Sequence, residues 1–213
     1  MLKPKYSADF NEAGHIYRIP GTDKQIPSST TIMGSLAVIN KKDPEAKPKQ
    51  LINMDHMKPI YAQRGTQRHD YNFLRLQGHK PDDLNTEDML DEDLEICENQ
   101  LTYWMDKEAV ILEVPMYSVD PFFAGTPDAI FKIDGLYYLN DWKNWFNEYY
   151  WYQISSYKYL LHVNYDIPLK NIRPRITDRS GHVHKLEDNE WEEYFHTFKE
   201  FVNVYNTIKV KGH

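Results

Sequence analysis

The stretch from residue 109 to residue 141 constrains the fold of this 213-residue chain more than any other part. It is rich in aromatic and β-branched residues, which favour extended strands, and it contains Asp134-Gly135, a dipeptide typical of tight hairpin turns. We predict strands over residues 109–118, 122–133 and 136–141. The last two should pair as an antiparallel hairpin, so the fold contains a β-sheet.

Helical periodicity marks most of the remaining chain. The spacing of Leu94, Cys97 and Leu101 predicts an amphipathic helix over residues 86–107. The other expected elements are helices over residues 60–77, 148–163 and 189–208, a second hairpin over residues 172–186, and short strands and turns over residues 1–34. This order predicts an α/β (α+β) fold in which a central mixed β-sheet is flanked by helices.

The composition suits one globular domain. Hydrophobic residues make up 41% of the chain, which is enough to build a substantial core, so we expect residues 1–213 to form a single domain. Residues 1–59 hold the short strands and a lysine- and proline-rich segment that we expect to be mobile. Residues 60–213 hold the core of the domain.

Cysteine content and hydropathy exclude several classes of protein. The single cysteine, Cys97, excludes an intrachain disulfide and an iron–sulfur cluster held by four cysteines of this chain, and we expect it to be a half-buried helix residue. No run of about 18 apolar residues could span a bilayer, and residues 1–6 lack the apolar stretch of a secretion signal. We therefore expect a soluble, cytoplasmic protein with no membrane partner.

The net charge of −7 argues at first against a nucleic-acid partner. The charge is unevenly distributed, however, because residues 1–80 carry 13 basic and 7 acidic side chains whereas residues 81–108 carry 1 basic and 11 acidic ones. The acidic segment is expected to be a solvated helix face, and the basic first third could line one wall of a cleft for DNA.

Charged residues stand within the predicted strands. Asp141 and Lys143 are two residues apart, so their side chains project from one face of the sheet. Asp128 begins the partner strand, and the hairpin register can bring it to the same end of the sheet as Asp141, while Glu113 could add a third carboxylate. Clustered carboxylates favour a bound Mg²⁺ or Mn²⁺ ion, which could activate water and polarise a phosphoryl oxygen while Lys143 faces the phosphate.

Five short motifs together resemble the RecB-type branch of the PD-(D/E)XK nuclease superfamily. They are Arg64-Gly65-Thr66-Gln67-Arg68-His69, Glu113 with Pro115, Gly125-Thr126-Pro127-Asp128, Asp141-Trp142-Lys143, and Gln153-Ile154-Ser155-Ser156-Tyr157. Within that branch the chain resembles mitochondrial genome maintenance exonucleases and related phage exonucleases. The resemblance implies a restriction-endonuclease-like core and a metal-dependent DNA exonuclease of replication, recombination or repair, in a bacterial or phage-infected cell.

The same resemblance implies a role for each matching residue. Metal ligands would be His69, Asp128 and Asp141 with help from Glu113, the catalytic lysine would be Lys143, and residues organising the active site and contacting DNA would be Gln153 and Tyr157. A histidine ligand shifts metal preference from Mg²⁺ toward Mn²⁺. The chain has neither the four cysteines of iron–sulfur members nor a helicase domain, so a helicase or a single-strand-binding protein is a candidate partner.

Further DNA contacts are expected from residues that are individually common on protein surfaces. They are Ser28, Ser29, Arg64, Thr66, Trp145 and Tyr157. The segment 41–58 is a candidate lid over a passage that admits a single strand with a free end, because its lysines Lys41, Lys42, Lys47 and Lys49 would attract the DNA backbone.

Each motif alone also has an ordinary structural explanation. An Asp-x-Lys sequence occurs on many surface strands, a pair such as Gln153 and Tyr157 can pack in a core, and His182 with His184 is expected on a solvated hairpin face. The joint order and spacing of the motifs favours a nuclease. Two other functions stay open: an endonuclease with the same core, and a non-catalytic DNA-binding module that keeps a nuclease fold.

Overall fold

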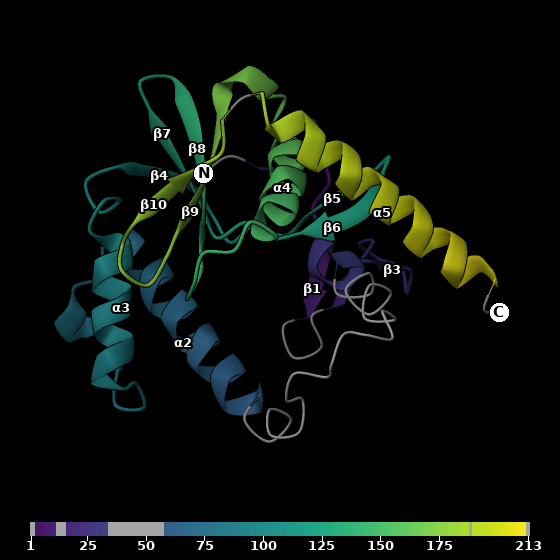
Figure 1. Cartoon of the computed structure of the whole chain (residues 1–213). Helices are drawn as coiled ribbons and strands as arrows, with labels where there is room; N and C mark the ends of the chain where they lie inside the picture. Colours follow the sequence, from purple (N-terminus) through teal and green to yellow (C-terminus); the bar gives the residue numbers. More distant parts are fainter. Residues whose placement is uncertain (1–2, 12–15, 34–57, 188, 212–213) are drawn as a thin grey trace, which may run out of the picture.

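The computed structural model describes residues 3–11, 16–33, 58–187 and 189–211 (Figure 1). The largest sheet has the strand order β10-β9-β8-β7-β4. Its strands are β4 (Glu108–Leu112), β7 (Ala129–Ile133), β8 (Leu136–Trp142), β9 (Ile172–Thr177) and β10 (Val183–Lys185). Strands β8 and β9 are parallel and the other pairs are antiparallel, which confirms the predicted mixed sheet.

Helices cover both faces of this sheet (Figure 1). They are α2 (Lys58–Leu76), α3 (Asp91–Leu101), α4 (Tyr150–Tyr165) and α5 (Trp191–Lys211). Successive residues of β7 point to opposite faces, so Phe131 packs with Leu101 of α3 whereas Ile130 packs with Ile154 of α4. The predicted flanking helices are therefore confirmed. None of the helices in the described part of the chain is long and apolar enough to cross a membrane.

Two smaller sheets lie beside the main one. One contains β1 (Asp9–Asn11), β2 (Ile16–Arg18) and β3 (Gln25–Ile26), and the other contains β5 (Met116–Val119) and β6 (Phe122–Gly125). Isolated bridges join Ser7 to Met116 and Ser28 to Ala124. These bridges bring the short N-terminal strands, which the sequence predicted, next to the β5–β6 hairpin.

The prediction of unbroken strands over residues 109–118 and 122–133 is wrong. Each stretch contains a proline, Pro115 or Pro127, which has no N–H to donate to a strand ladder. The chain therefore leaves the main sheet after β4, forms the β5–β6 hairpin, and re-enters the sheet at β7. Glu113 directly follows β4, where the chain leaves the main sheet, and Asp128 directly precedes β7, where it returns to that sheet.

The predicted helix over residues 86–107 is too long at both ends, because α3 runs only from Asp91 to Leu101. A short 3₁₀ helix (Pro81–Asp83) precedes α3, and α3 begins only at Asp91, where acidic side chains in the first turn favour a helix start. Cys97 is completely buried rather than half-buried, because its side of α3 packs against the sheet. The candidate lid 41–58 lies outside the described residues except for Lys58, with which α2 begins.

Candidate active site

The acidic residues of the motifs meet where β7 begins and β8 ends. The register places Ala129 opposite Asn140, so the next opposed pair along the hairpin is Asp128 and Asp141. The backbone N–H of Trp142 donates to Asp128 Oδ2 at 2.7 Å and holds this carboxylate against β8. Asp128 and Asp141 are only 7% and 2% exposed. The predicted meeting of the two carboxylates at one end of the sheet is confirmed.

Lys143 directly follows β8 and lies against Asp141. Its Nζ is 2.6 Å from Asp141 Oδ2 and lies 5.1 Å from the ring centroid of Tyr150. Its backbone is held on both sides, because its N–H donates to the carbonyl of Thr177 and its carbonyl accepts from the Gln100 amide of α3. The ammonium group is thus directed at the carboxylate two residues earlier, as the strand spacing predicted.

His69 on α2 brings a third element to the cluster. Its Nδ1 lies 3.3 Å from Asp128 Oδ1 and 3.9 Å from Glu113 Oε1. Glu113 has a φ of 46°, an uncommon conformation for a residue with a side chain, which costs on the order of 1–2 kcal/mol. Its N–H donates to the carbonyl of Asp128, so the kink at the end of β4 fixes Glu113 beside the cluster.

Burial and proximity shift the acidities of these groups. Burial, together with the charge of Asp128, raises the pKa of Asp141 to about 6. Burial also disfavours the charged form of Asp128, but His69 and Lys143 outweigh it and the pKa of Asp128 is lowered. The charge of Asp128 raises the pKa of His69 to about 9, and the two carboxylates raise the pKa of Lys143 against the effect of burial. At neutral pH two cations therefore balance two buried carboxylates.

Gln153 and Tyr157 lie on the face of α4 that is directed at this cluster. The Gln153 amide donates to the Tyr157 hydroxyl at 2.7 Å, which confirms that the two residues share one helix face. Burial and the charge of Asp141 raise the pKa of Tyr157 well above its usual value. A Cβ atom at Gly125 would lie 2.4 Å from Cε1 of Tyr157, so this close approach of α4 to β6 requires glycine. Tyr157 is 5% exposed, which leaves little of it available to DNA.

Two tyrosines that are not part of the motifs also lie beside the cluster of charged residues. The hydroxyl of Tyr17, in β2, is bonded to Thr126 Oγ1 at 2.9 Å, and Tyr17 is buried near Asp128. Tyr150, at the start of α4, lies under the Lys143 ammonium. Local sequence gives no signal for Tyr17, since only the bridge between the N-terminal strands and β6 brings it to the site.

The residues expected to contact DNA occupy different environments. Thr66 and Trp145 are exposed. Arg64 is directed into the protein instead, because its Nε and Nη2 atoms donate to the two carboxylate oxygens of Asp93 at 2.7 and 2.9 Å. In this arrangement the guanidinium of Arg64 joins α2 to α3.

Ser28 and Ser29 are buried and bonded within the protein. Ser28 Oγ accepts the N–H of Thr31 at 3.0 Å, so it caps the helical turn over residues 29–33. Ser29 Oγ is 2.8 Å from Ser156 Oγ of α4 and donates to the carbonyl of Ala124. The Ser29 hydroxyl therefore connects the N-terminal segment to β6 and α4, whereas the Ser28 hydroxyl bonds within that segment.

The β9–β10 hairpin is less solvated than expected at one of its histidines. His182 is exposed, but His184 is half-buried, stacks on Phe146 with ring centroids 4.0 Å apart, and bonds to Asp178 at 2.9 Å. These contacts give the histidine pair a structural role in the hairpin.

The donor set of the cluster fits a divalent cation by its chemistry. Three carboxylates and one imidazole, from Glu113, Asp128, Asp141 and His69, provide the ligands that Mg²⁺ and Mn²⁺ take. A cation would also relieve the repulsion that contributes to the raised pKa of Asp141. Across the described residues, no three His, Cys, Asp or Glu side chains form a ready-made metal centre. In this arrangement His69 and Lys143 neutralise the carboxylates themselves.

Comparison with known proteins assigns no family to this chain. No family model matches the sequence, and no curated protein matches it.

Proposed function

We propose that this protein is a Mg²⁺- or Mn²⁺-dependent deoxyribonuclease with a PD-(D/E)XK core, which hydrolyses phosphodiester bonds at Asp128, Asp141 and Lys143. The observation that carries the proposal is the convergence of separate sequence motifs. Residues from α2, the end of β4, the start of β7, the end of β8 and α4 gather around two opposed carboxylates.

A purely structural explanation of this cluster is unfavourable. Removing an ion from water costs several kcal/mol, and a buried ion pair often stabilises a protein no more than apolar residues of the same volume. Asp128 and Asp141 are both buried, and burial with the neighbouring carboxylate raises the pKa of Asp141 to about 6. Perturbed carboxylates that sit beside a lysine and a histidine are typical of functional sites.

The residues of the cluster would have different roles in phosphodiester hydrolysis. His69, Glu113, Asp128 and Asp141 would hold one or two metal ions. When bound, such an ion supplies Lewis acidity and neutralises negative charge. Lys143 stays positively charged at neutral pH and would contact a phosphoryl oxygen as charge builds on it. The Trp142 N–H fixes Asp128, and the Gln153–Tyr157 pair keeps the neighbouring face of α4 in place.

We further propose that the substrate is DNA with a free end and that single strands are preferred over duplex. The motifs resemble those of a branch rich in exonucleases. No helix or strand among the described residues is identifiable as a reader of base edges in a duplex groove, so selection of a strand by its end is the simpler basis for substrate choice. A helicase or a single-strand-binding protein would then be the natural partner that provides single strands.

Linear and circular single-stranded DNA of one sequence provide the deciding comparison. Each is incubated with the full chain in Mg²⁺ and in Mn²⁺, with end-labelled duplex in parallel and the Asp141→Asn protein as control for contaminating nuclease. We expect loss of the linear strand only, with the circle intact. Equal rates on both would assign an endonuclease instead. DNA binding without cleavage would assign a non-catalytic DNA-binding module.

A further inference from the structure

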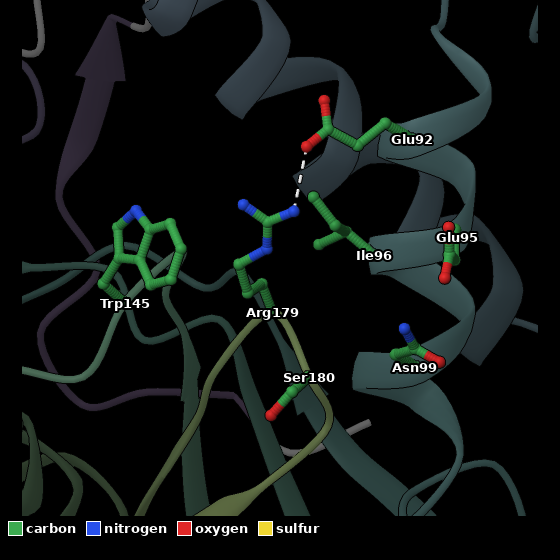
Figure 2. A pocket seen from close by; sticks show the side chains of 7 residues that line it. All are labelled: Glu92, Glu95, Ile96, Asn99, Trp145, Arg179 and Ser180. Carbon is green, nitrogen blue, oxygen red and sulfur yellow. Dashed lines mark hydrogen bonds and ion pairs between the residues drawn. The ribbon is translucent and has the colours of Figure 1, made fainter.

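A pocket of about 320 Å³ lies between α3 and the β9–β10 turn (Figure 2). Its lining residues are Glu92, Glu95, Ile96, Asn99, Trp145, Arg179 and Ser180. The volume falls in the range of small-ligand pockets, which is roughly 300–1,000 Å³. Trp145 is 66% exposed, and a large aromatic side chain left so open at a pocket mouth suggests a stacking surface. Neither the motifs nor the proposed chemistry account for this pocket.

The walls of the pocket are held by specific contacts. The hairpin turn approaches α3 so closely that a Cβ atom on Gly181 would lie 2.4 Å from the carbonyl oxygen of Asn99. Arg179 Nη2 donates to Glu92 Oε1 at 2.9 Å, and the Arg179 guanidinium lies 4.8 Å from the ring centroid of Trp145 (Figure 2). Hydrogen bonds from Arg179 and Arg64 lower the pKa of Glu92, so this carboxylate stays charged. The position of Trp145 is thus tied to α3 through one guanidinium.

We infer that this pocket binds one nucleobase of a DNA strand whose backbone lies at the active site, an inference that rests on the proposed function. Trp145 offers a ring on which any base can stack. Glu95 and Asn99 form no side-chain hydrogen bond with the part of the chain that the structure describes, so a carboxylate and an amide remain for the edge of the base.

The charges of the pocket favour a base over other ligands. A phosphate would face the carboxylates of Glu92 and Glu95, which repel it. A basic side chain of a protein partner would face Arg179, which already lies over the only aromatic ring among the lining residues. A neutral base with an exocyclic amino group is repelled by neither charge, and its amino group can donate to a carboxylate.

The distance to the active site fits a continuous strand. Trp145 follows Lys143 by two residues, so their Cα atoms are at most about 7 Å apart. A strand with one phosphate beside Lys143 therefore has a neighbouring base within reach of Trp145. The pocket would set the position of the strand at the site, and cytosine should bind better than thymine because only cytosine presents an amino group to Glu95.

The test measures binding of labelled oligo-dC and oligo-dT to the full chain by fluorescence anisotropy in EDTA, where metal-dependent cleavage cannot occur. Trp145→Ala should weaken oligo-dC binding about 10-fold, since loss of one base–aromatic stack costs roughly 5- to 150-fold in affinity. Trp145→Phe keeps an aromatic ring and should stay within about 3-fold of the unmodified protein. Tyr103→Ala is the matched control, because Tyr103 is an exposed aromatic residue that does not line the pocket. Glu95→Gln should reduce the preference for oligo-dC.

Two further outcomes separate this inference from the proposed function. If the unmodified protein cleaves DNA but Trp145→Ala binds both oligonucleotides normally, the pocket inference is overturned and the nuclease proposal stands. If Trp145→Ala loses affinity while the unmodified protein cleaves nothing in Mg²⁺ or Mn²⁺, the pocket binds DNA in a protein that is not a nuclease. Binding of a lysine-rich peptide that depends on Trp145, with normal DNA binding by the alanine variant, would assign the pocket to a basic protein segment.

Discussion

Two ion clusters of similar composition join α2 to the rest of the molecule. One, which we name the catalytic cluster after its proposed role, has His69, Asp128, Asp141 and Lys143 at its centre. The other, the rim cluster, has Arg64, Glu92, Asp93 and Arg179 at its centre. In each centre two carboxylates face two cations, with Glu113 beside the first centre and Arg68 beside the second. In the catalytic cluster burial raises the pKa of Asp141 to about 6, whereas in the rim cluster a hydrogen bond from Arg179 lowers the pKa of Glu92.

The two clusters also differ in how their cations are bound. Arg64 donates to Asp93 with two guanidinium nitrogens, a planar arrangement that fixes both partners. Lys143 contacts Asp141 as a single point charge, which can turn toward a phosphate without breaking a paired arrangement. The rim cluster should therefore serve stability, and the catalytic cluster should serve activity at some expense of stability.

The largest effect on DNA cleavage is expected from substitutions in the catalytic cluster. Asp128→Asn, Asp141→Asn and Lys143→Ala should each reduce DNA cleavage at least about 100-fold, because their charges act on metal and phosphate. Far-ultraviolet circular dichroism should show an unchanged fold. Asp106→Asn is the control, since the side chain of Asp106 is 74% exposed and pairs only with Lys107 in the described residues. Cleavage above a few per cent of the original rate in any of the three would remove that residue from the proposed chemistry.

The second prediction applies the same test to the rim cluster. Arg64→Ala should lower the free energy of unfolding by about 2–3 kcal/mol, because Asp93 is buried and loses its two-nitrogen partner. The cleavage rate of the folded variant should stay within about 5-fold of the original. Urea unfolding measures the first quantity, with Lys107→Ala at an exposed ion pair as control. Normal stability with lost DNA binding would instead support the sequence-based expectation that Arg64 contacts DNA.

The contrast between these clusters also shows what sequence patterns could predict. The alternation of β7 and β8 and their turn set the register, and the register alone brings Asp128 opposite Asp141. Helical spacing likewise predicted the shared face of Gln153 and Tyr157. Features that depend on one strand pair or one helix were therefore accessible before the structure.

Features that depend on contacts between residues far apart in the sequence cannot be predicted from local patterns. Arg64 and Trp145 were equal candidates for DNA contacts by residue type, and only the packing of α2 on α3 shows that one is bonded to Asp93 while the other is exposed. Tyr17 reaches the site through bridges between separate sheets. Pro115 and Pro127 lie among aromatic and β-branched residues that favour strands, so the local pattern does not show that the chain leaves the main sheet there.

The third prediction concerns the histidine of the catalytic cluster. His69→Ala should weaken Mn²⁺ binding about 10-fold or more and increase the Mn²⁺ concentration that cleavage requires, because one ligand is lost. Calorimetric titration of Mn²⁺ into the two proteins measures this directly. His79→Ala is the control, since His79 is an exposed histidine just beyond α2. Equal affinities would leave His69 as a structural partner of Asp128 alone.

The fourth prediction, with the smallest expected effect, is that the charge of Asp141 lowers the stability of the metal-free protein. In the metal-free fold the pKa of Asp141 is about 6, above its ordinary value of 3.8, so folding favours the protonated form. The stability that this carboxyl contributes is present below pH 4 and is lost as pH rises through 6. Asparagine is neutral at every pH, so Asp141→Asn should equal the original protein near pH 4 and become more stable between pH 5 and 7.

At pH 8 in EDTA we expect a gain of about 1–2 kcal/mol in the free energy of unfolding of Asp141→Asn, which is less than the pKa shift alone implies because Lys143 loses its partner. Glu92→Gln is the matched control, because the charge of Glu92 should affect stability in the opposite direction. The pKa of Glu92 is lowered in the fold, so its contribution is present above its ordinary pKa and is lost as pH falls. Urea unfolding at pH 4.5 and pH 8 compares the two variants. A less stable Asp141→Asn protein at pH 8 would mean that Lys143 holds Asp141 as firmly as Arg64 holds Asp93, and the distinction between the clusters would fail.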